Sequence, residues 1–555
     1  MDSVEGLLSY HKVADDRVTH HTVAHFTELA GIAFGNLYAL LLLLMELLAT
    51  LGDFDIQPFG GFIGEEALDL GCVLGELGLV EEGLAELDCL LLDSVFFGGS
   101  YHLLTYASQR TSATVRLLAS PRDRGDCFRC MGSPLRIGFV STRFHGTDGV
   151  TLEAKKWARV LEEKGHRCFW FAGKLDTPEA SSYLCDKAFF DHPEILELQS
   201  RLFDRKERGR ETSDQIHALR EEMKDALYKF CAKFDLDLLI PQNILAIPMH
   251  VPLGLAMTEF LAETRTPAIA HHHDFVWERE RFVHSCVPDY LRMAFPPQFG
   301  GKFRSVVINS KGQADLARRA GLPSTVVPNV FDYENPPPAP DGYADDFRAQ
   351  LGISKDETLV LQPTRVVPRK GIEHAIELVR ELQKRGRKIC LLVSHEAGDE
   401  GMDYYHLLKA RADEAGIRCH FAGDRIGEIR GEDADGNKVY TLWDAYPHAD
   451  FVTYPSLYEG FGNAFLETLY FCKPMLVNRY SVYTRDIQPL GFEVVEMDGV
   501  VTKNIADQVE AVLDDPEGEA TMVRHNYELA GRYFSHQVLH RTLGQLVGEL
   551  FGEDS

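Results

Sequence analysis

Short apolar runs alternate with amphipathic stretches from residue 135 onward. LRIGFV (135–140) and HRCFWFAG (166–173) have the length of buried strands, and GVTLEAKKWARVLEEKG (149–165) between them has helical spacing. Fully apolar strands that alternate with helices are typical of a parallel sheet covered on both faces. The same criteria predict further strands at 236–241, 267–272 and 305–310, and helices at 211–232 and 311–320.

A second alternation of this kind follows the segment 331–346, FDYENPPPAPDGYADD, which is proline-rich and acidic and predicts a linker. The polar segment 424–440 indicates a surface hairpin or loop. The pattern therefore predicts two doubly wound α/β domains that face a cleft, with ligands outside the carboxyl ends of the strands. In the second domain we expect strands at 359–364, 388–394, 417–423, 450–456 and 474–478, and helices at 371–385, 403–415, 463–472 and 504–515.

The first 130 residues show a different pattern, which predicts a helical N-terminal extension. Leucines at helical spacing in 70–94 weakly resemble one tetratricopeptide unit, but a single unit does not build a solenoid. The apolar run 37–52 is shorter than the roughly 20 residues of a membrane span and contains Glu46. We interpret it as a buried helix, with a membrane-surface or partner-binding helix as the alternative. The predicted units are an extension at 1–130, domains at 131–335 and 346–532, and a C-terminal segment at 533–555 whose residues 534–551 form an amphipathic helix.

Charge and cysteine content narrow the class of protein. Lysine and arginine number 57 against 84 acidic residues, a net charge of −27. A chain this acidic is not expected to bind nucleic acid, because non-specific binding needs a basic surface. The 11 cysteines lie mostly alone in apolar runs, which is typical of a reduced, cytoplasmic protein. Cys127 and Cys130 lack a second C-x-x-C pair, so two free thiols are expected rather than a metal or redox site. The charged opening MDSVEGLLSYHKVADDR does not predict a signal peptide.

The loop PTRVVPRKG (363–371) concentrates Arg365, Arg369 and Lys370 between a predicted strand and a predicted helix. Cations and backbone donors at a helix N-terminus are suited to phosphate. The alternative is a solvated basic turn, and this stretch alone does not decide between the two.

The segment YPSLYEGFGNAFLETLYFCKP (454–474) is more specific. A strand is predicted to end at Tyr454, a glycine-bearing turn carries Glu459, and a helix that begins near Asn463 contains Glu467. Glycines let the backbone approach a ligand closely. The two carboxylates are at most about 12 Å apart along a helix, so they could contact different parts of one elongated ligand. A capped helix with an internal glutamate is the alternative, but the cations of 363–371 favour a ligand site.

These motifs resemble those of a known family. EGFGNAFLE is similar to the E-x7-E pattern of retaining GT-B glycosyltransferases, above all family 4 (glycosyl transferases group 1), which includes sucrose-phosphate synthases and bacterial mannosyltransferases. TRVVPRKG resembles the Arg/Lys donor-phosphate loop of that family. TDGVTLEAKKWARVLEEKGH (147–166) resembles its N-terminal glycine loop and helix, although this chain has Asp148-Gly149 where the family usually has Gly-Gly. The resemblance covers roughly residues 135–550 and implies the GT-B fold.

The resemblance also implies roles for individual residues. Glu467 would bind the nucleotide ribose, Glu459 would hold donor-sugar hydroxyls or support the developing charge, and Arg365 and Lys370 would bind the diphosphate. Backbone groups of Phe461, Gly462 and Asn463 would contact the sugar. Fixed cations beside a leaving diphosphate are expected to stabilise the transition state. The family is thought to transfer with retention and without a protein nucleophile, and it generally needs no catalytic metal, so no cofactor is expected.

The run HHHDFVWERERF (271–282) begins with four potential metal ligands, three histidines and Asp274. Neighbouring strand residues point to opposite faces, so the three histidines cannot all bind one ion while extended, and zinc ligands usually come from spaced positions. The resembled family often has a histidine here that contacts the donor sugar. The best match is His273 and the alternative is His271. The acceptor side would be lined by Gly149, His271, Asp274, Trp277 and Arg281.

We therefore expect a retaining glycosyltransferase that moves a hexose from a nucleoside diphosphate sugar to an acceptor. The sequence leaves the acceptor open among a sugar, a glycerate-type compound and a lipid-linked compound. Peripheral membrane contact and oligomerisation through the extension also stay open. Two alternatives remain: a sugar phosphorylase of the same fold, and a non-catalytic sugar- or nucleotide-binding protein that recruits a partner through its extension.

Overall fold

The computed structural model describes residues 134–397 and 401–552. The predictions for the N-terminal extension, the runs 37–52 and 70–94 and the Cys127-x-x-Cys130 pair lie outside these residues. Within the described ranges, none of the helices combines the length and hydropathy that a membrane span requires.

The first domain is built on a seven-stranded parallel sheet in the order β3-β2-β1-β4-β5-β6-β7. Its strands are β1 Arg136–Val140, β2 Arg167–Ala172, β3 Ser182–Leu184, β4 Leu238–Pro241, β5 Ala268–His272, β6 Phe303–Val307 and β7 Thr325–Val326. Its helices are α7 Gly149–Glu163, α8 Pro193–Leu202, α9 Arg210–Phe234, α10 Val251–Thr264, α11 Pro288–Ala294 and α12 Ser310–Ala320.

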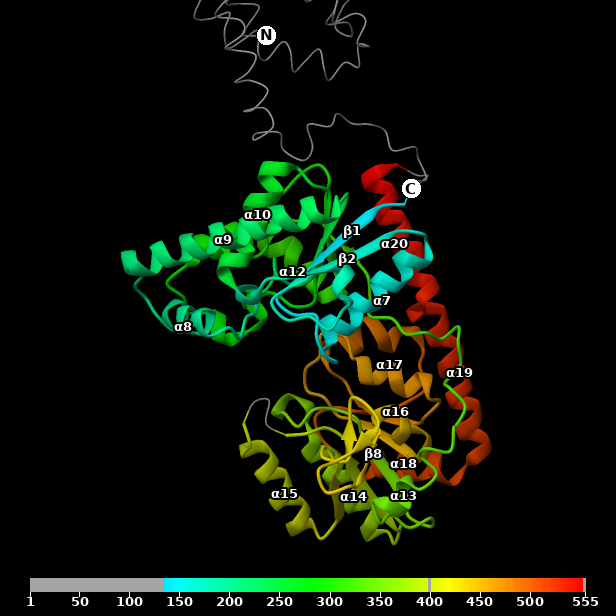
Figure 1. Cartoon of the computed structure of the whole chain (residues 1–555). Helices are drawn as coiled ribbons and strands as arrows, with labels where there is room; N and C mark the ends of the chain where they lie inside the picture. Colours follow the sequence, from blue (N-terminus) through cyan, green and yellow to red (C-terminus); the bar gives the residue numbers. More distant parts are fainter. Residues whose placement is uncertain (1–133, 398–400, 553–555) are drawn as a thin grey trace, which may run out of the picture. The chain divides into compact units, whose positions relative to one another are not determined.

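Both faces of this sheet are buried, as its apolar strands predicted. Ile137 and Phe139 of β1 pack in one core cluster with residues of α7 and with Leu543 of the C-terminal helix α20 (His536–Phe551). Val140 of the same strand packs in another cluster, with Phe230 of α9. Alternate residues of a strand point to opposite faces, so a strand covered on both sides is apolar throughout. Figure 1 shows α7 beside α20, and α9 with α10 further along the sheet.

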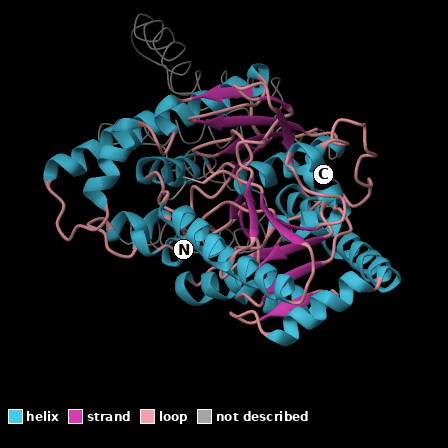
Figure 2. Ribbon diagram, turned by 90° about the horizontal axis from the view of Figure 1, so that it is seen from below, coloured by secondary structure: helices cyan, strands magenta, loops and turns pink. Residues whose placement is uncertain are grey.

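The second domain has a six-stranded parallel sheet in the order β10-β9-β8-β14-β15-β16. Its strands are β8 Thr358–Gln362, β9 Ile389–Val393, β10 Arg418–Phe421, β14 Phe451–Tyr454, β15 Met475–Asn478 and β16 Val495–Met497. Its helices are α13 Phe347–Gln350, α14 Ile372–Lys384, α15 Asp403–Ala415, α16 Leu442–Ala445, α17 Asn463–Tyr470, α18 Lys503–Asp514 and α19 Pro516–Phe534. Figure 2 shows the strands of the sheets with helices along them.

Three short strands form a separate small sheet within the predicted surface hairpin: β11 Ile426–Gly427, β12 Gly431–Glu432 and β13 Lys438–Thr441. β12 pairs antiparallel with β13, so the segment 424–440 contains a hairpin, as its polar pattern indicated. The predicted linker 331–346 has no long element, but aromatic residues fix both of its ends. Phe331 and Tyr333 are buried, and the ring of Tyr343 packs edge-on against Tyr440.

The chain passes between the domains twice, and the two crossings lie side by side. The backbone N–H of Phe331 donates to the carbonyl of Phe534 at 2.8 Å, and Phe331 forms a parallel bridge with Ser535. The helix predicted at 534–551 actually begins at His536, because Phe534 ends α19 and Ser535 is extended and caps α20. The crossing returns the chain to the first domain.

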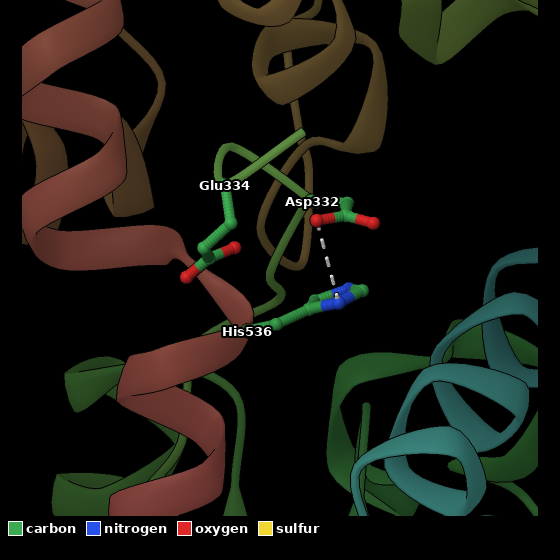
Figure 3. Close-up of side chains that lie close together, drawn as sticks. All are labelled: Asp332, Glu334 and His536. Atoms are coloured by element: carbon green, nitrogen blue, oxygen red, sulfur yellow. Dashed lines mark ion pairs between the residues drawn. The ribbon is translucent and has the colours of Figure 1, made fainter. Parts of the chain in front are cut away.

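Asp332, Glu334 and His536 gather at this double crossing, with one ligand-type atom of each within 4.8 Å of the others (Figure 3). Arg159 pairs with Asp332 at 3.0 Å, and Glu334 accepts a hydrogen bond from the backbone N–H of Gln537 at 3.0 Å. The two carboxylates are thus already engaged by a cation and by the first turn of α20. We interpret the cluster as a tie between the crossings rather than a metal site.

Candidate active site

The loops after β8 and β14 lie against each other at the carboxyl edge of the second sheet. The backbone N–H of Leu457 donates to the carbonyl of Arg369 at 2.8 Å. Gly371 has φ +61°, and a Cβ there would lie 2.5 Å from the carbonyl oxygen of Pro455. A glycine is therefore required for this approach. The approach brings Lys370 next to Glu459.

Glu459 is buried and meets two cations of the neighbouring loop. Its Oε1 accepts from Lys370 Nζ, and its Oε2 accepts from Arg369 Nη1 at 3.1 Å. Burial alone would raise the pKa of Glu459, but the charges of Lys370 and Arg369 outweigh burial and hold the pKa below its usual value. Glu459 is therefore a carboxylate at neutral pH, and it fixes Lys370 in place.

Lys370 is the centre of a dense positive site. It is buried, its Nζ lies 5.8 Å from the ring centroid of Tyr454, and Arg369 and Arg365 are near enough to act on it. Burial, followed by these two guanidinium groups, lowers the pKa of Lys370 despite the opposing effect of Glu459. Arg365 is exposed at the edge of this group. Glu459 balances part of this positive charge, and a bound diphosphate would offer further acceptors to the three cations.

The turn after β14 leads into α17 with its helix N-terminus uncapped by any side chain. Gly462 has φ +128°, and a Cβ there would lie 2.8 Å from the hydroxyl of Tyr454. The hydroxyl of Tyr480 donates to the carbonyl of Phe461 at 2.7 Å, which holds the turn. Asn463 is the first helical residue and is half-buried. An open helix N-terminus beside cations favours a negatively charged ligand group.

Glu467 lies one turn further along α17 and is half-buried. The hydroxyl of Tyr446, in the short helix Tyr446–His448, donates to its Oε2 at 3.3 Å. Burial raises the pKa of Glu467 to about 7, against the opposing charge of Lys156 from α7. Part of this side chain is open to a ligand, and its charge state changes near neutral pH.

The histidine run ends β5, and its rings alternate as expected. The rings of His271 and His273 lie 4.3 Å apart, whereas His272 packs against Phe275 at 5.3 Å. His271 is fully buried and stacks on Trp157 of α7 at 4.1 Å, so it lies behind His273. His273 is partly exposed whereas His271 is buried, and the geometry favours His273 for contact with a ligand.

Burial lowers the pKa of His273 to about 4, although Asp274 and Asp148 oppose this effect. The ring is therefore neutral at physiological pH. Its Nε2 lies 3.2 Å from Oε1 of Gln242, so with this amide orientation Nε2 carries the proton and donates it. Nδ1 is then the acceptor atom of the ring.

Gln242 and Asn243 directly follow β4 and hold the end of β5, and neither residue was predicted to belong to the site. Asn243 accepts from the backbone N–H of His273 at 3.0 Å and donates to Asp274 Oδ1 at 2.8 Å. Its own backbone N–H donates to the carbonyl of His271 at 2.8 Å, with φ +61°. Their position in the sequence could have indicated this role, because polar residues directly after an apolar strand lie at the edge where ligands of parallel sheets bind.

The carboxyl edges of the two sheets meet through their loops. A Cβ on Gly460 would lie 3.5 Å from the carbonyl oxygen of His273, so the loops after β14 and β5 are adjacent. Further contacts between the domains are Asn309 Nδ2 to the Gly460 carbonyl at 2.6 Å, Asn329 Nδ2 to Asn463 Oδ1 at 2.6 Å, Ser310 N to Asp486 Oδ2 at 2.7 Å and Thr147 Oγ1 to Glu428 Oε1 at 2.9 Å. The histidine run and the E-x7-E segment thus belong to one site.

Gly149 begins α7 opposite α17, and a Cβ on it would lie 3.7 Å from Asn463 Nδ2. The preceding Asp148 caps α7 by accepting from the N–H groups of Val150 and Thr151, and it pairs with Arg143 at 3.3 Å. The N-terminus of α7 is therefore occupied by a carboxylate of the chain itself, unlike that of α17.

The remaining predicted acceptor-side residues lie on the segment after β5. Asp274 pairs with Arg279. Trp277 stacks on Phe275 at 4.6 Å and lies under Arg319, so its ring is largely committed to packing. Arg281 is exposed, contacts Met249 Sδ, and lines an open depression of about 510 Å³ beside α8.

Comparison with known proteins decides the family. Residues 344–529 match the family model described as glycosyl transferases group 1. The chain is 34% identical over 392 residues to mannosylglucosylglycerate synthase of Petrotoga mobilis, which covers 65% of this chain and 86% of the relative. This chain belongs to the group 1 glycosyltransferases. A second glycosyltransferase relative, mannosylglucosylglycerate synthase of Thermotoga maritima, is 29% identical, over 74% of this chain and 100% of its own.

Solved structures place this glycosyltransferase in the GT-B fold. Sucrose-phosphate synthase of Thermosynechococcus elongatus matches with a TM-score of 0.53 and 16% identity, over 75% of this chain and 99% of its own. Anabaena HepE, solved with UDP and glucose, matches with a TM-score of 0.50 and 15% identity, over 75% of this chain and 99% of its own. The predicted pair of Rossmann-like domains is confirmed.

Proposed function

We propose that this glycosyltransferase moves a hexose, with retention of anomeric configuration, from a nucleoside diphosphate sugar to an acceptor hydroxyl. The observation that supports it most is the buried pair of Lys370 and Glu459 with Arg369 alongside, at the uncapped N-terminus of α17. These groups offer positive charge for a diphosphate. Glu467, further along the same helix, offers acceptors for ribose hydroxyls.

In the proposed reaction the bond between the anomeric carbon and the diphosphate oxygen breaks, and the acceptor oxygen bonds to that carbon on the same face. The acceptor proton passes to the departing phosphate oxygen. Lys370, Arg369 and Arg365 would stabilise the charge that develops on the diphosphate, which is often the largest catalytic term. We propose no protein nucleophile and no catalytic metal, because these cations supply the charge that a metal would otherwise bring.

His273 would face the donor sugar from the first domain. Its neutral ring would accept a hydrogen bond from a sugar hydroxyl at Nδ1, while Gln242 holds Nε2. Glu459, already bound by two cations, would orient them and accept from a hydroxyl of the sugar.

The names of the two mannosylglucosylglycerate synthases suggest the substrates to test first. We propose a mannosyl donor and a glycoside of glycerate as the acceptor, which is one of the classes that the sequence left open. The test incubates the protein with GDP-, UDP- and ADP-linked mannose and glucose, each with glucosylglycerate, glycerate or glucose. Mass spectrometry identifies the product, and the one-bond C1–H1 coupling constant in its NMR spectrum gives the anomeric configuration.

The expected result is one product, the glycerate glycoside extended by one hexose, in which the new bond has the donor's anomeric configuration. An inverted product would overturn the retaining mechanism. Turnover of a sugar 1-phosphate in place of all nucleotide sugars would establish a phosphorylase. Binding of a nucleotide sugar without transfer or hydrolysis would establish a binding protein.

A further inference from the structure

A buried ion pair on α7 holds the first crossing between the domains. Glu153 is 1% exposed and Lys156 is 17% exposed, and their side chains lie 2.5 Å apart. Lys156 Nζ also donates to the carbonyl of Val330 at 2.6 Å, and the N–H of Val330 donates to Glu153 Oε2 at 3.5 Å. One turn of α7 thus binds both the carbonyl and the N–H of Val330.

Stability does not by itself explain such a pair. Removing two charges from water costs about as much as their attraction returns, so apolar residues of similar size often serve equally well. The pair therefore indicates that the charge of Lys156 has a role beyond stability.

The residues on either side of Val330 contact both ends of α17. Asn329 Nδ2 donates to Asn463 Oδ1 at the first residue of the helix. The ring of Phe331 lies 5.1 Å from Lys156 Nζ and packs at 4.7 Å against Tyr470, the last residue of the helix. Asn463, Glu467 and Tyr470 have i, i+4, i+7 spacing, so they share one face of α17. The crossing that Lys156 holds at Val330 runs along that face, because its neighbours contact both ends of the helix.

Three groups face the carboxyl of Glu467: Lys156 from α7, Tyr446 from the short helix 446–448, and Tyr333 from the crossing, whose hydroxyl donates to the carbonyl of Leu466 at 2.8 Å. Lys156 is the cation among them. Burial lowers the pKa of His536 of α20, and the charges of Arg159 and Lys156 add to this effect while Asp332 opposes it. An ammonium has three N–H groups, and Glu153 and Val330 use two of those on Lys156.

We propose that Lys156 is a positioning residue for the donor: an ammonium of the first domain that favours the carboxylate form of Glu467 of the second domain, so that Glu467 can accept hydrogen bonds from the nucleotide ribose. This inference rests on the proposed function, which assigns Glu467 to the donor. Nucleotide affinity would then depend on the contact of α7 with the crossing at Val330, although Lys156 need not contact the nucleotide.

The experiment measures binding of UDP, GDP and ADP by calorimetry between pH 6 and pH 9. Lys156→Met removes the charge and keeps the length of the side chain. Its matched control is Lys155→Met, the next lysine on α7, which pairs with Asp176 at 2.9 Å. Loss of one nearby opposite charge raises a carboxyl pKa by about one unit or more. From a pKa of about 7, the ionised fraction of Glu467 at pH 7 would fall from about a half to about a tenth.

For the nucleotide that binds wild type, Lys156→Met is expected to lose about fivefold in affinity at pH 7 and to recover nearly all of it by pH 9. Lys155→Met should match wild type throughout. Lys156→Arg keeps the charge and should restore the wild-type pH profile. Combining Lys156→Met with Glu467→Gln should give no further loss beyond Glu467→Gln alone.

An unchanged affinity, an equal loss at every pH, or additive effects in the double variant would overturn the inference while leaving the donor site standing. A Glu467→Gln variant that binds nucleotide like wild type would instead overturn the donor assignment and the inference with it, as would a wild-type protein that binds none of the three nucleotides. Thermal melting of each variant checks folding, and if Lys156→Met is unfolded, the comparison of Lys156→Arg with Lys156→Gln replaces it.

Discussion

Lys370 and Glu459 are 89 positions apart in the chain, yet the ammonium of one lies against the carboxylate of the other in a buried pair. The pair exists because β8 and β14 are neighbours in the sheet, so the loops that follow them share one edge. Its consequence is an immobilised cation at the site proposed for the donor diphosphate.

Lys370→Ala is expected to lose most turnover while the protein still folds. Removal of one preorganised charge beside a leaving group costs on the order of 3 kcal/mol, or about a hundredfold in kcat. Steady-state kinetics measure the loss. The control is Lys388→Ala, because Lys388 is 74% exposed in the same domain and pairs only at the surface with Asp356. Equal activity of the two variants would refute the phosphate assignment.

Donor affinity is expected to fall as the pH drops below about 7. Burial raises the pKa of Glu467 to about 7, so acid protonates a carboxylate that must accept ribose hydrogen bonds. If only the ionised form binds, affinity decreases by about tenfold for each pH unit below that pKa. Calorimetric titration across the pH range measures it. Glu467→Gln should bind weakly and without this pH dependence, and a Gln variant that keeps the wild-type profile would contradict the assignment.

Gln242→Glu is expected to bring the titration of His273 into the physiological range. In the wild type burial lowers that pKa to about 4, and the ring is neutral. A carboxylate at Nε2 favours the protonated ring and raises its pKa by about one to three units. Protonation of His273 should then add a second step to the acid limb of the kcat/KM profile, so that the limb becomes steeper than the one that Glu467 alone gives. Gln242→Leu removes the same hydrogen bond without adding charge, and it should keep the wild-type shape of the limb; identical profiles of Gln242→Glu and Gln242→Leu would argue against contact between His273 and the substrate.

Treatment with a chelator is expected to leave activity intact. The cations on the loop after β8 supply the positive charge that the departing diphosphate needs. Turnover with and without EDTA measures the effect. Loss of activity that zinc restores would contradict this prediction and would indicate a metal site at the histidines of β5 or at the Asp332 cluster.

The fold could be predicted because it depends on local apolar periodicity. Long strands such as β1 and β9 came within a residue or two of their predicted bounds. The strands β3, β7 and β16 were not predicted, because they have only two or three residues and show no apolar run above background. The strand predicted at 305–310 ends earlier, because the side-chain amide oxygen of Asn309 accepts from the N–H of Gly312 and starts α12.

The arrangement of the candidate site could be predicted from the sequence only in part. Arg365, Lys370, Glu459 and Glu467 stand in motifs, and the sheet order brings their loops together. Arg369 was seen as a basic residue, but its bond to Glu459 depends on how two loops pack. The hydrogen bonds of Gln242 with His273 and of Lys156 with Val330 join residues 31 and 174 positions apart, so no local pattern reveals them.

The position of α20 has a consequence for how the protein is made. Its leucines complete one face of the first sheet, including Leu539 and Leu543, which are fully buried. The ribosome releases these residues only after the second domain has emerged. The first domain therefore exposes an apolar face until α20 has been synthesised, and a chain truncated at Ser535 would leave that face exposed and prone to aggregation. The first domain can complete its core only after α20 has emerged.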